Sequence, residues 1–281
     1  MTEAPSLWLI VIEFLRYLRY SLTLWQGKIL AGVELCEIIA IAKNKDSFFL
    51  KKKRWYAPIL IWTGNWQLQQ QGSFVKVLMG QDWYRWEQEI YGCAYGKIVS
   101  IDSQERLQIP AVSGISLSTF LNSSEYLQPA KFNALIAAAQ ALKYMHTLQV
   151  RWSDGIEGLF SHGDATAENV IYNPTEDTAY WIDFDTVHLT DAPQLWRQAD
   201  DLRALIYSAA FYATEVDLAE LVSVIIKAYS EPVVLQQMWQ LVNFWSNRPN
   251  SYHLAQAPVT YQNYKKLEQL ICVELGELGL N

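Results

Sequence analysis

The sequence predicts an α+β fold with two lobes, a small β-rich lobe followed by a larger helical one. Three observations predict this class: strand-like patterns fill residues 34–109, a connector with Pro110 and Gly114 follows, and helical periodicity dominates the rest. The 281 residues are 51% hydrophobic and 18% charged, which excludes a disordered or fibrous protein. We expect three segments: an N-terminal amphipathic helix within 1–30, the small lobe over 31–111 and the large lobe over 112–281.

The first segment holds the most apolar stretch of the chain, residues 7–25. Glu13, Arg16 and Arg19 interrupt it, whereas a membrane span needs about 20 apolar residues. The apolar run before Glu13 is too short for a signal peptide, and no small-residue cleavage pattern follows. The helical spacing of its apolar residues predicts an amphipathic helix that packs on the body of the protein, on a partner subunit or on a membrane surface.

The small lobe combines strand patterns with one helical pattern. Short β-branched and aromatic runs, bounded by polar turns such as Thr63-Gly64-Asn65, predict its strands. A run with apolar residues at helical spacing predicts a helix in the middle of the lobe. We expect strands over 38–42, 48–50, 59–62, 74–78, 98–101 and 106–109, with the helix over 83–97.

The large lobe is predicted to be mainly helical. Pro129 suits the first turn of a helix, and the apolar residues that follow share one face. A block of short strands and loops, residues 159–187, separates this helix from the later ones. We expect helices over 129–146, 199–213, 216–229, 233–246 and 261–276.

The chemistry of the sequence is concentrated in residues 161–188. His162-Gly163-Asp164 is followed by Asn169, five residues after the aspartate, and by two strand patterns joined by a polar turn. The second strand pattern ends in Asp183-Phe184-Asp185. Mg²⁺ binds carboxylate and amide oxygens and shares its coordination with substrate phosphates. The pattern therefore predicts a hairpin that presents Mg²⁺ ligands and leaves Asp164 to accept a proton from an attacking hydroxyl.

This block resembles the catalytic core of the protein-kinase-like phosphotransferases. In that superfamily a His-x-Asp loop with Asn five residues on precedes an Asp-Phe-x metal motif. Gly163, in place of arginine, makes the loop similar to that of the aminoglycoside, choline and related small-molecule kinases. The resemblance implies a two-lobed protein-kinase-like fold, the use of ATP and Mg²⁺, and an active cleft between the lobes.

The resemblance also implies a role for each matching residue. Asp164 corresponds to the catalytic base that orients the acceptor hydroxyl. Asn169 and Asp183 correspond to the residues that hold the metal ions bridging the ATP phosphates. His162 is expected to support the loop, and Asp201, or its neighbour Asp200, to brace the loop backbone.

A lysine of the small lobe, ion-paired to a helix glutamate, is expected to hold the α- and β-phosphates. We predict Lys76 paired with Glu89, because the helix follows Lys76 within a few residues. Glu87 is an alternative partner on the same helix, and Lys51 or Lys52 is an alternative lysine. No glycine-rich run precedes Lys76, so the sequence does not predict a backbone cradle for the phosphates.

The spacing of the motifs favours a small acceptor over a protein. Seventeen residues separate Asp183 from Asp201, and they contain no Ala-Pro-Glu triplet. A segment of this length is too short to form a peptide-binding activation segment. The glycine before Asp164 also removes the usual arginine partner of a regulatory phosphothreonine. We therefore predict transfer of the γ-phosphoryl group of ATP to a hydroxyl of a sugar, aminoglycoside or amino-alcohol. The alternatives are an atypical Ser/Thr protein kinase and a catalytically silent pseudokinase that acts as a scaffold.

Charge and cysteine content limit which partners and which cellular compartment we expect. There are 22 lysines and arginines against 29 aspartates and glutamates, a formal net charge of −7. A nucleic-acid partner is not expected, because proteins that track phosphate backbones carry a basic face. Three widely spaced cysteines predict neither a disulfide framework nor a zinc site, and they favour a reducing, cytoplasmic location.

Overall fold

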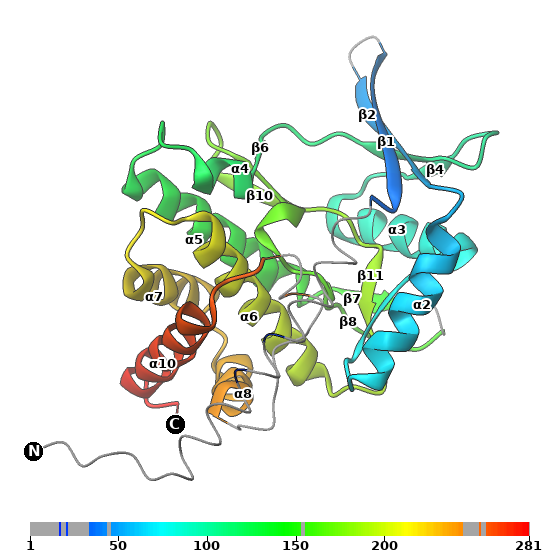
Figure 1. The fold of residues 1–281 in the computed structure, drawn as a ribbon. Helices are drawn as coiled ribbons and strands as arrows, with labels where there is room; N and C mark the ends of the chain where they lie inside the picture. Colours follow the sequence, from blue (N-terminus) through cyan, green and yellow to red (C-terminus); the bar gives the residue numbers. More distant parts are fainter. Residues whose placement is uncertain are drawn as a thin grey trace, which may run out of the picture.

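The computed structural model describes residues 34–43, 46–152, 155–243 and 257–280, together with Tyr17, Ser21 and His253. The N-terminal helix expected within residues 1–30 thus falls outside the described residues, apart from Tyr17 and Ser21, which are helical. None of the described helices is long and apolar enough to cross a membrane. A small strand-rich N-terminal part precedes a mainly helical remainder (Figure 1). The division into two lobes at residue 111 stays a prediction.

An antiparallel sheet forms the N-terminal part, with strand order β1-β2-β5-β4. This sheet confirms four of the six strands expected for this region, those near residues 40, 49, 100 and 108. Lys51 and Lys53 lie two residues apart on β2, so their side chains leave the same face of the sheet. The strands are β1 (Cys36–Lys43), β2 (Asp46–Lys53), β4 (Ser100–Ile101) and β5 (Leu107–Pro110).

A helix that the sequence reading missed follows β2. The strand expected over 59–62 is wrong, because these residues lie inside α2 (Ala57–Gln70). In a short apolar run, periodicity alone does not distinguish a buried strand from a helix. Pro58 stands in the first turn, where proline favours a helix, and Gly64 is a buried helical residue and not a turn. α2 leads to β3 (Val75–Val77), the strand expected around Lys76.

The helix expected over 83–97 is confirmed as α3 (Gly80–Tyr95). It ends at Gly96, whose left-handed φ of +60° suits the residue that terminates a helix. Trp83, Glu87 and Ile90 are three and four residues apart and are all buried, so they share the inner face of α3. The inner face therefore contains one carboxylate, Glu87, among apolar side chains.

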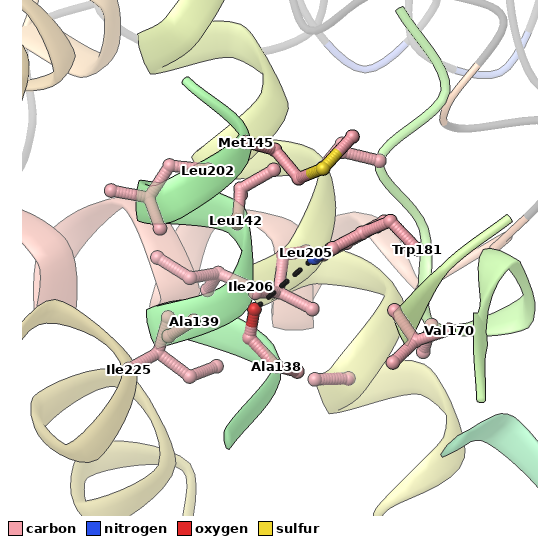
Figure 2. Packing of buried hydrophobic residues seen from close by; sticks show 14 of the residues in the cluster. Ala138, Ala139, Leu142, Met145, Val170, Trp181, Leu202, Leu205, Ile206 and Ile225 are labelled. Atoms are coloured by element: carbon pink, nitrogen blue, oxygen red, sulfur yellow. Dashed lines mark hydrogen bonds between the residues drawn. The ribbon is translucent and has the colours of Figure 1, made fainter. Parts of the chain in front are cut away.

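The remainder of the chain is built on a helical core. Ala138, Ala139 and Leu142 of α5 pack against Leu202 and other residues of α6, as Figure 2 shows. The helices expected in this region are confirmed, with ends that differ by up to five residues; residues 244–246 of the helix expected over 233–246 lie outside the described residues. The helices are α4 (Leu117–Asn122), α5 (Gln128–Met145), α6 (Gln194–Tyr212), α7 (Leu218–Tyr229), α8 (Pro232–Asn243) and α10 (Tyr261–Glu277).

Short strands between α5 and α6 confirm the expected strand-and-loop block. β9 and β10 form an antiparallel hairpin that β6 extends, and Trp181 at the end of β10 donates its indole N–H to the Ala138 carbonyl across 3.3 Å. β11 pairs with β3, although 108 or more residues separate them. The strands between α5 and α6 are β7 (Gln149–Arg151), β8 (Glu157–Leu159), β9 (Val170–Asn173), β10 (Thr178–Trp181) and β11 (Thr186–His188), whereas β6 (Ile115–Ser116) precedes α4.

Candidate active site

The loop His162-Gly163-Asp164 has a backbone that only glycine fits at its centre. Gly163 has a φ of +81°, in the left-handed region that side chains disfavour. A Cβ atom there would lie 2.8 Å from the backbone of Val187 in β11. The absence of a side chain at Gly163 thus lets the loop pass directly against the strand that follows Asp185.

His162 connects the loop to the end of β10. Its Nδ1 accepts the backbone N–H of Asp164 across 3.3 Å, and its Nε2 donates to the Ile182 carbonyl across 3.0 Å. These two bonds require the neutral ring with its proton on Nε2. Burial lowers the His162 pKa to about 4, which agrees with a neutral ring at pH 7. The neutral His162 ring therefore links the Asp164 backbone to the end of β10.

Asp201 holds the same loop from α6. Its carboxylate accepts the backbone N–H of His162 across 2.7 Å and that of Gly163 across 2.9 Å, and also the His146 Nε2 proton across 3.0 Å. Its neighbour Asp200 instead pairs with Arg203 across 2.6 Å. Of the two aspartates considered from the sequence, Asp201 is thus the one that contacts the loop backbone.

The two carboxylate oxygens of Asp164 have different surroundings. Its Oδ2 accepts the side-chain amide of Asn169 across 2.9 Å, and the same amide donates to the Asp164 carbonyl, also across 2.9 Å. The Oδ1 atom is buried and accepts no hydrogen bond from the described residues. Burial, reinforced by the charges of Asp183 and Asp185, raises the Asp164 pKa well above its usual value. A raised pKa makes the ionised carboxylate a stronger base, and its Oδ1 accepts no hydrogen bond from the described residues, so this oxygen is available to the proton of a hydroxyl.

Asp183 lies where β10 ends, in a left-handed backbone conformation with a φ of +61°. The N–H of the preceding residue, Ile182, donates to the Asn169 carbonyl across 2.9 Å, so the two candidate metal ligands are fixed by adjacent backbone. The Asp183 side chain is 36% exposed and forms an ion pair with Lys51. It is the most accessible carboxylate of this group, since Asp164 is only 7% exposed.

Lys51, on β2, is the lysine that reaches Asp183. Its Nζ also lies 3.6 Å from Glu87 Oε1 on α3 and 3.7 Å from Asp185 Oδ2. Burial alone would lower the Lys51 pKa, but Asp183, Asp185 and Glu87 together hold it well above its usual value. Burial raises the Glu87 pKa to about 7, and the Lys51 charge only partly opposes that shift. The buried lysine is therefore charged and has carboxylates on both sides.

The structure corrects the expected pairing of Lys76 with Glu89. Lys76 lies on β3 opposite Val187 of β11, outside the β1-β2-β5-β4 sheet. Glu89 accepts the backbone N–H of Arg151 across 3.1 Å on the outer side of α3. β3 is the strand that directly precedes α3 in the sequence, but it follows α2 and pairs with β11 and not with the sheet. Lys52, the other alternative, is exposed and donates to the Gln104 carbonyl across 3.0 Å.

Sequence reasoning missed a second lysine of this cluster, which is largely buried. Lys53 forms an ion pair with Asp185, and its Nζ lies 4.8 Å from the centre of the Trp83 ring. The Lys53 and Lys51 charges lower the Asp185 pKa, although burial opposes this. The signal was present in the run of three lysines at 51–53, because alternate residues of a strand share a face.

The sequence also did not indicate that all four histidines are buried around one site. His188 Nε2 lies 3.4 Å from Asp200 Oδ2, and His253 Nε2 donates to the Gly163 carbonyl across 2.8 Å. His146 donates to Asp201, as described above. These histidines are far apart in the sequence, so no local pattern predicts that they surround the loop.

Asp183 and Asn169 are the two side chains whose oxygens could hold a magnesium ion. Asp183 offers an accessible carboxylate. The two hydrogen bonds of the Asn169 side chain to Asp164 are both donated by its amide nitrogen and do not use its amide oxygen. Across the part of the chain that the structure describes, no group of three or more His, Cys, Asp or Glu side chains could hold a metal ion. Two protein ligands are nevertheless typical of Mg²⁺ sites that share the ion with substrate phosphates.

Comparison with family models finds no match for this chain, and comparison with curated proteins finds none either. Among solved structures, the chain is similar to the crystal structure of a "putative aminoglycoside phosphotransferase" from Ralstonia eutropha JMP134. The two chains are 8% identical and have a TM-score of 0.35, and the match covers 92% of this chain and 98% of the other. Because this likeness is low, we base the function on the residues of the site.

Proposed function

We propose that the protein is a phosphotransferase of the protein-kinase-like class. It would use ATP and Mg²⁺ to phosphorylate a hydroxyl of a small molecule, of the sugar, aminoglycoside or amino-alcohol type. One observation carries the proposal. Lys51, paired with Glu87, contacts the same Asp183 whose charge raises the pKa of Asp164. The groups proposed as phosphate-binding cation, metal ligand and base thus belong to one cluster, although 112 residues lie between Lys51 and Asp164 in the sequence.

Each group has a defined task in such a reaction. Asp164 Oδ1 would accept a hydrogen bond from the acceptor hydroxyl and orient it toward the phosphorus atom. Lys51 would exchange its contact with Asp183 for phosphate oxygens and remain fixed by Glu87. Asp183 and the Asn169 amide oxygen would hold Mg²⁺, which neutralises charge on the phosphates.

The segment after Asp185 favours a small acceptor over a protein. Leu78 N–H donates to the Asp185 carbonyl across 2.7 Å, and Leu189 N–H donates to the Phe74 carbonyl across 2.7 Å. Between these bonds β11 pairs with β3 along its whole length. The backbone of residues 185–189 is therefore engaged within the chain, which leaves only residues 190–193 before α6 begins.

The direct test is phosphoryl transfer from ATP to a panel of sugars, aminoglycosides and amino-alcohols in the presence of Mg²⁺. We expect at least one acceptor to be phosphorylated by the wild type, and the product to be absent with Asp164→Ala. Asp191→Ala, which removes an exposed aspartate beyond β11, is the matched control and should retain transfer. Transfer to no member of the panel, with no ATP turnover, would contradict the proposed function.

A further inference from the structure

The outward face of α2, together with the turn that precedes it, exposes four large apolar side chains. Trp55, Ile59, Trp62 and Trp66 are 88%, 65%, 67% and 59% exposed. Their spacing of four, three and four residues places them on one side of the helix and of the turn that leads into it. We call these four residues the tryptophan face.

The opposite side of α2 is already buried against its own chain. Ala57, Ile61, Gly64 and Leu68 form this inner side, and Ala57 and Ile61 pack with Val77 of β3. α2 is thus apolar on both sides, a pattern typical of a helix that is covered all round. An exposed apolar patch of several hundred Å² on a folded protein marks an interaction site.

We propose that the tryptophan face binds the tryptophan face of a second copy of this chain. The spacing of the four residues is symmetric about its midpoint. When two such helices pack antiparallel across a two-fold axis, Trp55 of each copy faces Trp66 of the other, and Ile59 faces Trp62. Spacings that alternate between four and three residues are also those of a helix-to-helix seam, and a two-fold interface requires a surface that is complementary to itself.

Charge favours this place for a contact between identical chains. Each copy has a formal net charge of −7, so two copies repel each other over most of their surfaces. Residues 55–71 include no aspartate, glutamate, lysine or arginine. Two copies can therefore meet along α2 without placing like charges opposite each other.

The available area indicates a weak dimer. At about 150–250 Å² for a whole aromatic side chain, the exposed parts of the three tryptophans amount to about 300–500 Å² in each copy. Two copies, with Ile59 added, approach the roughly 1,200 Å² at the lower limit of stable interfaces. We therefore expect a dimer that dissociates on dilution.

The test is the mass of the full chain in solution, measured by sedimentation equilibrium from low to high micromolar concentration. The wild type should change from monomer to dimer over this range. Trp62→Glu should weaken association at least about 30-fold, because a buried tryptophan at the centre of an interface is a typical hot spot. Ile98→Glu is the matched control: Ile98 is 87% exposed but lies outside the tryptophan face, and the variant should dimerise like the wild type.

A charge swap tests the antiparallel register. Trp55→Glu alone should weaken the dimer, and adding Trp66→Lys should restore part of the affinity, because the two new charges face each other between copies. Circular dichroism and melting temperature check that each variant is folded.

Three results would overturn the proposal. The first is a wild type that is monomeric at every concentration. The second is a Trp62→Glu chain that dimerises as the wild type does. The third is a monomeric wild type that binds phosphatidylcholine vesicles through Trp62, which would assign the face to a lipid surface.

Discussion

The ammonium group of Lys51 lies 3.6 Å from the carboxylate of Glu87, and the two side chains are 4% and 0% exposed. This pair joins β2 of the sheet to the inner face of α3. The same ammonium group contacts Asp183, at the end of a strand 130 residues further along the chain. The position of the metal-motif aspartate is thus coupled to the packing of α3 against the sheet.

Lys51→Met should abolish binding of Mg²⁺-ATP, because it removes the cation that would hold the phosphates. Lys76→Met is the matched control and should bind nucleotide like the wild type, since Lys76 lies on β3 outside this cluster. Isothermal titration calorimetry well below the melting temperature measures both. Loss of binding in Lys76→Met, with Lys51→Met unaffected, would restore the assignment made from the sequence.

Asp164→Asn should lower turnover by about 10²–10⁴-fold while nucleotide binding persists, the usual effect of losing a general base. It should also raise the melting temperature of the nucleotide-free protein at about pH 8. The folded state raises the Asp164 pKa, so ionising this buried carboxyl costs stability as the pH rises above its unfolded value. The advantage of the variant should shrink on acidification toward about pH 4. An unchanged melting temperature at alkaline pH would show that the buried carboxylate is not destabilising.

Gly163→Ala should reduce the free energy of unfolding by more than about 2 kcal/mol, because strain and a backbone clash add together. Gly155→Ala isolates the strain: its φ is +84°, but nothing lies within 4 Å of the added Cβ atom. Urea unfolding of both variants gives the difference, which reports the contact with Val187. Equal losses in the two variants would mean that the loop moves away from β11 at little cost.

His162 should make the protein less stable in acid. Its pKa falls from 6.5 to about 4 on folding. The neutral ring therefore contributes fully to the free energy of unfolding above pH 6.5, and this contribution is lost as the pH falls through 4. A shift of this size corresponds to about 3 kcal/mol. His162→Gln cannot take up this proton, so its free energy of unfolding should fall less between about pH 7 and pH 4. Parallel curves for the two proteins would contradict a buried neutral His162.

The parts of the site that could be predicted from sequence are those that are local in the chain. The loop at His162–Asp164, Asn169 five residues later and Asp183 at a strand end form a contiguous block, and the structure places them together. Whether these groups act as assigned stays a prediction. The strand content of the block could be predicted for the same reason, since each strand has its own apolar alternation.

The parts that could not be predicted depend on contacts between distant segments. The choice between Lys51 and Lys76 depends on which strand joins the sheet, and the unrecognised helix α2 decides this. The choice between Glu87 and Glu89 depends on which side of α3 faces inward, which is set by packing against β2. The positions of Lys53 and His253 similarly follow only from the assembled fold.

The most direct test of the central claim is thermal melting of the wild type and Asp183→Asn with ATP, in the presence and absence of Mg²⁺. A ligand that binds only the folded state raises the melting temperature. We predict a Mg²⁺-dependent rise for the wild type and no such rise for Asp183→Asn, which keeps the shape of the side chain but lacks the charge. The absence of any rise for the wild type at millimolar nucleotide, or the same rise in both proteins, would contradict the assignment of this site to metal and nucleotide.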